Sequence, residues 1–227
     1  MIMRVLRTSL PLLLLGVALG LVARTPGWTH ADLAVSEAVR RVRAPWPTAI
    51  AQVLNVVFGT FAGLVLVAVL VGLLAVLGRV RLAVLTFTVI AAGWLVSPIF
   101  KALVGRPRPP AAYLLTPELG SGSYPSGHVC LTLSVAVAVA LLAHGTRWFR
   151  PAAAVGAIIV VAQMLARIYL GAHYPTDTVG SILLTTAATY PVIVYRETVE
   201  HWAARIEHPR PPGRPPRFTP PRTGGGS

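Results

Sequence analysis

Long apolar stretches separated by short polar segments dominate the chain. Six can be marked: Thr8–Ala23, Ile50–Leu77, Leu82–Phe100, Val129–Ala143, Ala152–Leu170 and Thr178–Tyr195. A helix needs about 20 mainly apolar residues to cross a bilayer, within a range of about 17 to 25. The first and fourth stretches are short and depend on flanking residues, whereas the second is long enough to tilt or to begin outside the hydrocarbon. The pattern predicts an all-α, polytopic membrane protein built as a bundle of six transmembrane helices.

The segment before the second stretch, residues 1–49, has two features of its own. Two arginines precede the first stretch and an alanine ends it, which fits either a retained first span or a cleaved signal peptide. After this stretch, apolar residues recur at helical spacing from Ala31 to Val42, with charged residues on the other faces. That spacing predicts either an interfacial helix on the outer membrane surface or a helix that faces solvent.

The remaining chain divides into a predicted functional core, residues 50–196, and a basic tail, residues 197–227. From Arg205 to Arg222 the tail has five arginines and seven prolines, which disfavour helix and sheet and predict a disordered cytoplasmic segment. Nucleic-acid binding, attraction to anionic lipid headgroups and a positive anchor without a partner are all compatible with this composition. We favour the anchor and expect no nucleic-acid partner.

Composition supports a membrane protein and excludes other classes. Hydrophobic residues make up 55% of the chain and charged residues 12%, against roughly 25% charged residues in soluble proteins. The mean hydropathy is +0.69. A soluble domain of this size cannot bury so much apolar surface, which excludes a cytosolic enzyme and a disordered hub protein. Seven acidic residues are too few for an evident carboxylate metal cage, and Cys130 is the one cysteine, so we expect no metal, cofactor or disulfide.

The arginines indicate which loops are cytoplasmic. Twelve of the 20 basic residues lie near the two chain ends and in the loops after the second and fourth stretches, all on one side. The positive-inside rule makes that side cytoplasmic. The other eight lie on the opposite side, so the bias is weak unless some outer charges serve chemistry. We predict a protein of the cell membrane with an extracytoplasmic active site.

Three polar clusters lie at the ends of the last four stretches, on the predicted outer side. They occupy residues 101–109 after the third stretch, 124–128 before the fourth, and 167–177 between the fifth and sixth. Alternating topology brings all three to one membrane face. Ionisable residues at membrane depth are costly and usually functional, so this face is the predicted active site.

The clusters contain groups that suit phosphate. Lys101, Arg108 and Arg167 supply three cations, and guanidinium groups match the paired oxygens of a phosphate. The Ser-Gly-His sequence at 126–128 begins a helix, where backbone N–H groups and the helix dipole attract an anion. Each motif alone is common in proteins that do no such chemistry. Their conjunction favours a phosphate site.

Two histidines and one carboxylate complete a possible mechanism. His173 and Asp177 are four residues apart and share a helix face if the sixth helix begins near Pro175. A carboxylate there can hold one imidazole nitrogen protonated and leave the other free as a nucleophile. His128 is a second histidine, able to protonate a leaving oxygen. Together with the cations, these residues describe phosphoryl transfer without a metal ion.

The motifs Lys-x6-Arg-Pro, Pro-Ser-Gly-His and Arg-x5-His-x3-Asp, in this order, resemble the signature of the type 2 phosphatidic acid phosphatase superfamily. The resemblance spans roughly residues 50–196 and implies a six-helix membrane core and a metal-independent phosphatase. It implies that the phosphoryl group is bound by Lys101, Arg108, Ser126, Gly127 and Arg167. His173 would form a phosphohistidine, Asp177 would orient it, and His128 would protonate the leaving oxygen and then activate water.

One position departs from the family pattern. The third motif usually begins Ser-Arg, and this chain has Ala166 before Arg167. The lost hydrogen bond is worth about 1 kcal/mol, which predicts a slower or differently tuned enzyme that is still active.

The predicted substrate is a lipid phosphate or diphosphate in contact with membrane lipids. Polyprenyl diphosphate, phosphatidylglycerol phosphate and phosphatidic acid are the candidates. The alternative is a transporter or lipid-phosphate-binding protein that uses the same cationic pocket without catalysis. A vanadate-dependent haloperoxidase shares the motifs, but the apolar six-stretch chain argues against that soluble class. The sequence makes no prediction of oligomeric state.

Overall fold

The structure, a computed structural model, describes residues 1–118, 120 and 122–207, with side chains as far as residue 203. Its regular elements in this part of the chain are helices, and Pro107 forms an isolated antiparallel bridge with Gly122. In chain order they are α1 Ile2–Ala23, α2 Pro26–Arg41, α3 Pro45–Val57, α4 Thr60–Val76, α5 Val80–Trp94, α6 Val96–Val104, the 3₁₀ helix η1 Ala111–Tyr113, α7 Gly127–Leu142, α8 Phe149–Tyr169, α9 Pro175–Val194 and α10 Arg196–Glu207.

Several of these helices are long and apolar enough to cross a membrane. Among the described residues, α1, α8, α9 and the combined α5–α6 segment Val80–Val104 meet this criterion by length and composition. The α3–α4 pair adds a fifth span if both helices count as one, while α7 is apolar but only 16 residues long. The protein is therefore a multi-pass helical membrane protein. The count of six spans stays a prediction.

The second apolar stretch forms two helices instead of one tilted span. α3 ends at Val57 and α4 begins at Thr60, with a bend of 59° between them. A Cβ at Gly59 would lie 2.9 Å from the carbonyl oxygen of Asn55, so the absence of a side chain permits this tight turn. The predicted boundary between residues 49 and 50 falls inside α3, so the outer segment and the core share this helix.

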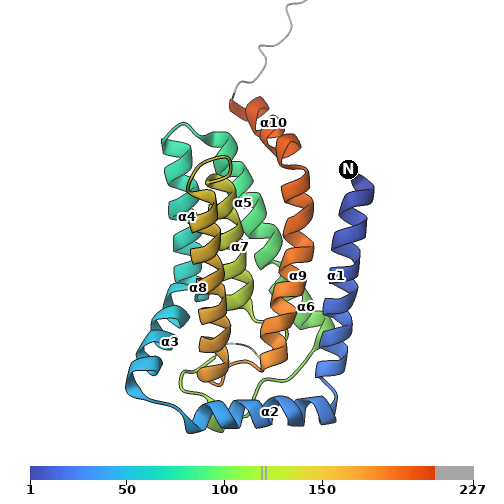
Figure 1. Cartoon of the computed structure of the whole chain (residues 1–227), viewed down its shortest axis with the longest axis vertical. Helices are drawn as coiled ribbons and strands as arrows, with labels where there is room; N and C mark the ends of the chain where they lie inside the picture. Colours follow the sequence, from blue (N-terminus) through green and yellow to red (C-terminus); the bar gives the residue numbers. More distant parts are fainter. Residues whose placement is uncertain (119, 121, 208–227) are drawn as a thin grey trace, which may run out of the picture.

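The long helices α1, α4, α5, α7, α8 and α9 lie roughly side by side, and α2 crosses one end of them (Figure 1). Part of the core lies between α5 and α7, where Val89, Ile90 and Leu131 are buried. Small residues let neighbouring helices approach closely: a Cβ at Gly156 of α8 would lie 2.9 Å from the Cβ of Ala136 in α7. This packing holds the helix ends, which carry the polar clusters, in defined positions.

Tyr124 holds the loop before α7 between α1 and α9. Its side chain is completely buried, and its hydroxyl donates a hydrogen bond to the carbonyl oxygen of Gly16 in α1. A Cβ would come within 2.6 Å of the ring at Gly20 of α1 and within 2.2 Å at Gly180 of α9. In this structure α1 is thus packed as part of the bundle.

The helix predicted between the first two apolar stretches is present as α2. Asp32 and Ser36 are buried against the protein, whereas Val35 and Val42 of the predicted apolar face are 47% and 70% exposed. The polar face therefore packs on the bundle and the apolar face points away from it. This orientation supports an interfacial helix in contact with lipid over a helix that faces water.

The chain remains helical after the last apolar stretch. α10 extends from Arg196 to Glu207, so the prediction of a disordered tail is wrong for residues 197–207. The prolines on which that prediction relied begin only at Pro209. Residues 208–227, which hold most of the tail's arginines, lie outside the described residues.

Candidate functional site

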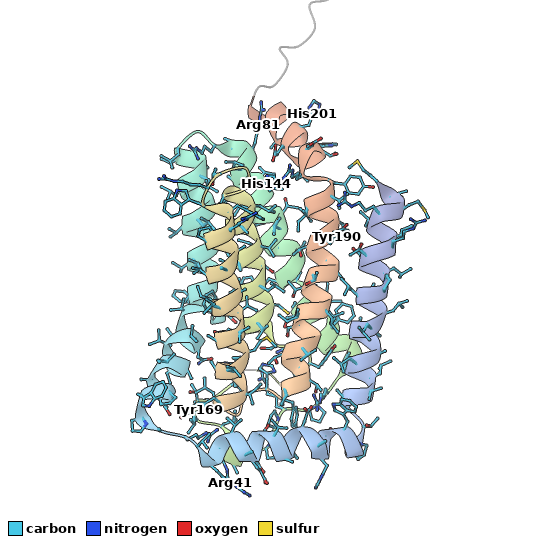
Figure 2. All side chains as sticks on the ribbon, in the orientation of Figure 1. Arg41, Arg81, His144, Tyr169, Tyr190 and His201 are labelled. Carbon is cyan, nitrogen blue, oxygen red and sulfur yellow. The ribbon has the colours of Figure 1, made fainter. Side chains whose placement is uncertain are left out.

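The three polar clusters meet at the end of the bundle that α2 crosses. The end of α6 and the chain after it carry residues 101–109, the loop leading into α7 carries 124–128, and the turn between α8 and α9 lies within 167–177. Figure 2 shows Tyr169, inside the third cluster, at this end of the molecule and His144 at the other. The alternating path of the helices therefore brings the clusters together, as the sequence analysis expected.

A cavity of about 900 Å³ opens among these segments. Its apolar lining comes from the α3–α4 bend and the α5–α6 segment and includes Phe58, Phe61, Leu64, Trp94 and Leu95. Its polar lining includes Lys101 of α6, Arg108, His128 and His173. A cavity lined by both charged and apolar side chains suits an amphiphilic ligand with an anionic group.

The eight residues predicted from the sequence fall into two layers. Those that line the cavity are Lys101, Arg108, Gly127, His128 and His173. Those that are completely buried behind it are Ser126, Arg167 and Asp177. Of these three residues, Arg167 contacts Glu118, which itself lines the cavity.

Two of the predicted cations share one carboxylate, which the sequence analysis did not identify. Glu118 Oε1 lies 2.6 Å from Arg167 Nη2, and Glu118 Oε2 lies 3.4 Å from Arg108 Nη1. Arg167 also donates a hydrogen bond through Nη1 to the side-chain oxygen of Asn55. Burial lowers the pKa of Arg108, and the Glu118 carboxylate opposes that shift. Glu118 therefore supplies the anion that both guanidinium groups contact in this structure.

The start of α7 presents its backbone and one histidine to the cavity. Ser126 is the N-cap residue, but its side chain makes no capping bond, and its buried Oγ has no hydrogen-bond partner among the described residues. His128 Nε2 lies 3.2 Å from the carbonyl oxygen of Asn55. A Cβ at Gly127 would come within 3.0 Å of Ser97 Oγ, so glycine at this position also lets α6 approach α7. The N-terminal end of α7 is thus open toward the cavity.

The two ring nitrogens of His173 have different surroundings. Nδ1 lies 3.4 Å from Asp177 Oδ2, on the first turn of α9, and Nε2 lies 3.5 Å from Arg108 Nη1. Burial, and next the charges of Arg167, Arg108 and Lys101, hold the pKa of His173 well below its ordinary value of 6.5. The imidazole is therefore neutral at neutral pH, the form in which one nitrogen keeps a free lone pair.

Sequence reasoning missed five polar residues of this region: Asp32, Asn55, Arg106, Glu118 and Ser123. Asp177 accepts hydrogen bonds from the Ser123 hydroxyl and, at 2.6 Å, from Arg106 Nη1. The acids carried a usable signal, because only seven occur in the chain and Asp32 and Glu118 both lie in its cationic outer segments. Arg106 lay inside the predicted cluster 101–109 but was assigned no function. Asn55 and Ser123 carried no signal, since their contacts depend on the α3–α4 bend and on the path of the loops.

Three acidic residues at this end of the bundle contact guanidinium groups: Asp32, Glu118 and Asp177. Within the part of the chain that the structure describes, no group of three or more His, Cys, Asp or Glu side chains is arranged to hold a metal ion. Glu118 instead pairs with Arg108 and Arg167, and Asp177 pairs with Arg106. Besides Arg108, the titratable side chains that line the cavity are Lys101, Glu118, His128 and His173.

Comparison with known proteins identifies the family. An undecaprenyl-diphosphatase of Sulfolobus acidocaldarius is 35% identical over 72 residues, which span 32% of this chain and 32% of that relative, about a third of its length. The crystal structure of the first transmembrane PAP2 type phosphatidylglycerolphosphate phosphatase from Bacillus subtilis has the same fold, with a TM-score of 0.75 and 23% identity, over 84% of this chain and 96% of that one. A family model described as the PAP2 superfamily matches residues 81–200, which contain all three motifs. Because this match covers more than half of the chain, the protein belongs to the PAP2 superfamily.

Proposed function

We propose that this protein is an integral membrane phosphatase that removes the terminal phosphate from a lipid phosphate or diphosphate through a phosphohistidine intermediate. The lipid phosphatases of the PAP2 family are hydrolases, which supports the reaction class. One observation carries the proposal. The neutral His173 has Nδ1 beside Asp177 and Nε2 beside Arg108, and it lines a cavity that has both cationic and apolar side chains in its lining.

In the first step, Nε2 of His173 attacks the phosphorus atom of the substrate. An N–P bond forms and the P–O bond to the leaving group breaks. Burial, and next the charge of Arg167, lower the pKa of His128, so this histidine takes up a proton only with the anionic substrate bound and then gives it to the departing oxygen. The Nδ1–H group of His173 donates to Asp177, which stabilises the positive charge that develops on the ring. Arg108 and Lys101 contact the phosphoryl oxygens, on which negative charge is concentrated.

In the second step, water attacks the phosphohistidine. His128, now neutral, takes one proton from the water as the new P–O bond forms and the N–P bond breaks. Inorganic phosphate leaves, and His173 returns to its neutral form. Each residue ends the cycle in its starting protonation state, so no metal ion or other reactant is needed for the balance.

The apolar lining of the cavity supports a lipid as the substrate. Phe58 lies in the α3–α4 bend, Phe61 and Leu64 lie on α4, and Trp94 and Leu95 lie at the end of α5. A lipid can keep its tail against these residues while its headgroup reaches the histidines. Polyprenyl diphosphate, phosphatidylglycerol phosphate and phosphatidic acid are the candidate substrates, and the names of the two relatives favour the first two.

Glu118 has an electrostatic function before the substrate binds. Its carboxylate neutralises Arg108 and Arg167 while no phosphate is bound, which offsets the cost of placing two cations close together. An incoming phosphate competes for the same guanidinium groups. Binding then exchanges one anion for another instead of desolvating bare charges.

Phosphate release by the purified protein in detergent tests the proposal. The assay contains a chelator and a panel of lipid phosphates and diphosphates, and it compares the wild type with His173→Ala and with His144→Ala as a control at the opposite end of the bundle. We expect release that survives the chelator, is abolished in His173→Ala and is unchanged in His144→Ala. A single-turnover experiment with labelled substrate should trap the phosphohistidine. A transporter or lipid-phosphate-binding protein would bind the substrate and never become labelled.

Cysteine labelling tests the proposed extracytoplasmic location of the site. Arg41 is exposed on α2, and Cys130 is buried, so an Arg41→Cys variant carries one accessible thiol among the described residues. It should react with a membrane-impermeant reagent in intact cells. Arg147→Cys, in the loop between α7 and α8, should react only after lysis. The opposite pattern would place the active site on the cytoplasmic face.

A further inference from the structure

Arg106 forms a buried bridge between the predicted orienting carboxylate and the outer helix. Its Nη1 donates to Asp177 Oδ1 at 2.6 Å, and its Nη2 donates to Asp32 Oδ2 at 2.7 Å. Arg106 is 1% exposed and Asp32 5% exposed, so water screens these two ion pairs little. Asp32 belongs to α2, which reaches the end of α9 through this guanidinium group.

Additional contacts hold the guanidinium group in one orientation. Arg106 Nη1 also donates to Thr176 Oγ1 at 2.7 Å, and the Thr176 hydroxyl donates to Asp32. The guanidinium carbon lies 4.0 Å from the centre of the Tyr174 ring, within the range of a cation–π contact. Arg106, Asp32, Thr176 and Tyr174 therefore form one connected network that borders Asp177.

The network divides the two oxygens of Asp177 between different partners. Oδ1 contacts Arg106, while Oδ2 accepts hydrogen bonds from the Tyr174 amide at 2.9 Å and from the Ser123 hydroxyl, and lies 3.4 Å from His173 Nδ1. A carboxylate fixed at both oxygens cannot rotate. Arg106 therefore holds Asp177 so that Oδ2 faces the histidine.

We infer that Arg106 and Asp32 are positioning residues for the nucleophile, and that α2 thereby belongs to the catalytic apparatus. The inference rests on the proposed function, in which His173 attacks phosphorus. Neither residue touches the substrate: Arg106 acts through Asp177, and Asp32 acts through Arg106. The function of α2 is then to supply the carboxylate that orients this guanidinium group.

The chemical consequence concerns the proton on the imidazole. An ionised Asp177 accepts a hydrogen bond from Nδ1–H of His173, which leaves Nε2 without a proton and able to attack. Without Arg106, the buried carboxylate loses its cationic partner, and an unpaired buried charge favours uptake of a proton. A protonated Asp177 donates to Nδ1 instead. The single ring proton then sits on Nε2, and the nucleophilic lone pair is lost.

Arg106 and Arg108 thus have different functions although they are two residues apart. Arg108 lines the cavity and lies near His173 Nε2, where the phosphoryl group binds in the proposed mechanism. Arg106 is buried and contacts the carboxylate behind Nδ1. Loss of Arg108 should weaken phosphate binding, whereas loss of Arg106 should slow the chemical step with phosphate binding intact.

Single-turnover kinetics and inhibition by inorganic phosphate separate these effects. We expect Arg106→Gln to slow phosphohistidine formation on the order of 100-fold, the loss associated with a misplacement of about 1 Å at a reacting group. Asp32→Asn, which keeps Arg106 and its contact with Asp177, should slow the step about 10-fold. The inhibition constant of inorganic phosphate should stay within about twofold of the wild type in both variants. Glu37→Gln, a carboxylate exchange on α2 at a residue that pairs with Tyr113, is the matched control and should change neither quantity.

The double variant tests whether Asp32 acts only through Arg106. If it does, Arg106→Gln combined with Asp32→Asn should be no slower than Arg106→Gln alone, because coupled residues are not additive. Arg106→Lys keeps a cation but cannot contact Asp177 and Asp32 through two separate N–H groups of a planar guanidinium. Its rate should therefore lie between those of Arg106→Gln and the wild type. Rates are expressed per folded protein, measured by gel filtration, so that a loss of folding alone does not count as a loss of rate.

Three results would overturn the inference. The first is an unchanged rate of phosphohistidine formation in both single variants. The second is a loss of phosphate affinity as large as the loss of rate. The third is a double variant whose rate falls by the product of the two single-variant factors. If Arg106→Gln does not fold, Asp32→Asn decides by the same two measurements. A wild type that releases no phosphate would instead reject the proposed function.

Discussion

Replacing Glu118 with glutamine tests whether its carboxylate competes with phosphate for the guanidinium groups of Arg108 and Arg167. Glutamine has nearly the same shape but no charge, so the variant removes the competing anion and leaves the packing in place. The carboxylate lies 2.6 Å from Arg167 and 3.4 Å from Arg108, and its side chain is 10% exposed. If phosphate displaces it, the variant should bind phosphate more tightly than the wild type.

The structure sets the size of the expected effect. A contact with a charged partner contributes about 1.5 to 3 kcal/mol; the short Glu118–Arg167 ion pair belongs to this class, whereas the longer contact with Arg108 adds little. Since 1.4 kcal/mol corresponds to about tenfold in affinity, Glu118→Gln should lower the inhibition constant of inorganic phosphate roughly 10- to 100-fold. Tighter product binding should also lower kcat if phosphate release limits turnover.

The assay is competitive inhibition of lipid phosphate hydrolysis by inorganic phosphate in detergent. Glu37→Gln is the control, because Glu37 pairs with the Tyr113 hydroxyl and contacts neither Arg108 nor Arg167. It should leave the inhibition constant unchanged. An inhibition constant in Glu118→Gln that is unchanged or higher would refute the reasoning. It would mean that Glu118 stays in place during catalysis and holds Arg108 and Arg167 in position.

Three further variants or conditions give clear expectations. Ala166→Ser restores the residue usual in the family, and one added hydrogen bond of about 1 kcal/mol should leave kcat unchanged or raise it about fivefold; a large loss would show that the buried alanine is required. Gly180→Ala places a methyl group within 2.2 Å of the Tyr124 ring and should destabilise the protein by about 1 to 3 kcal/mol or more, seen as a lower thermal midpoint in detergent. The control Gly72→Ala, with nothing within 4 Å of the added methyl group, should keep the midpoint of the wild type. Equal midpoints in the two variants would contradict the packing of Tyr124 against α9. Because the pKa of His173 lies well below 6.5, this residue stays neutral as the pH falls through 6.5. Protonation of His173 should therefore not lower the rate of phosphohistidine formation near that pH. A decline with a midpoint near 6.5 would show that the environment of His173 does not lower its pKa.

The helices and the meeting of the motifs were predictable because both follow from local pattern. Apolar runs of about 20 residues form spans, and alternating spans bring residues 101–109, 124–128 and 167–177 to one end. The pairing of His173 with Asp177 was predictable from their spacing of four, although His173 lies just before α9 and only Asp177 is on its first turn. These features need no knowledge of tertiary contacts.

The bend and the partners of the charged residues were not predictable in the same way. The apolar run around Gly59 contains no proline, so it looks continuous, and the break depends on the carbonyl oxygen of Asn55. Glu118 reaches the site only through the path of the loop between α6 and α7. The partner of Arg106 lies 74 residues earlier in the chain, at Asp32, and no local pattern connects the two.

The placement of Tyr124 between α1 and α9 has a consequence for biogenesis. The loop that leads to His128 needs Gly16 and Gly20 on one side of the ring and Gly180 on the other. α9 leaves the ribosome after the other two elements, so the loop reaches its final packing only when this last span has been inserted. A nascent chain therefore passes through the translocon before the loop that carries His128 has its final packing, and the cavity takes its final shape only when the bundle is complete.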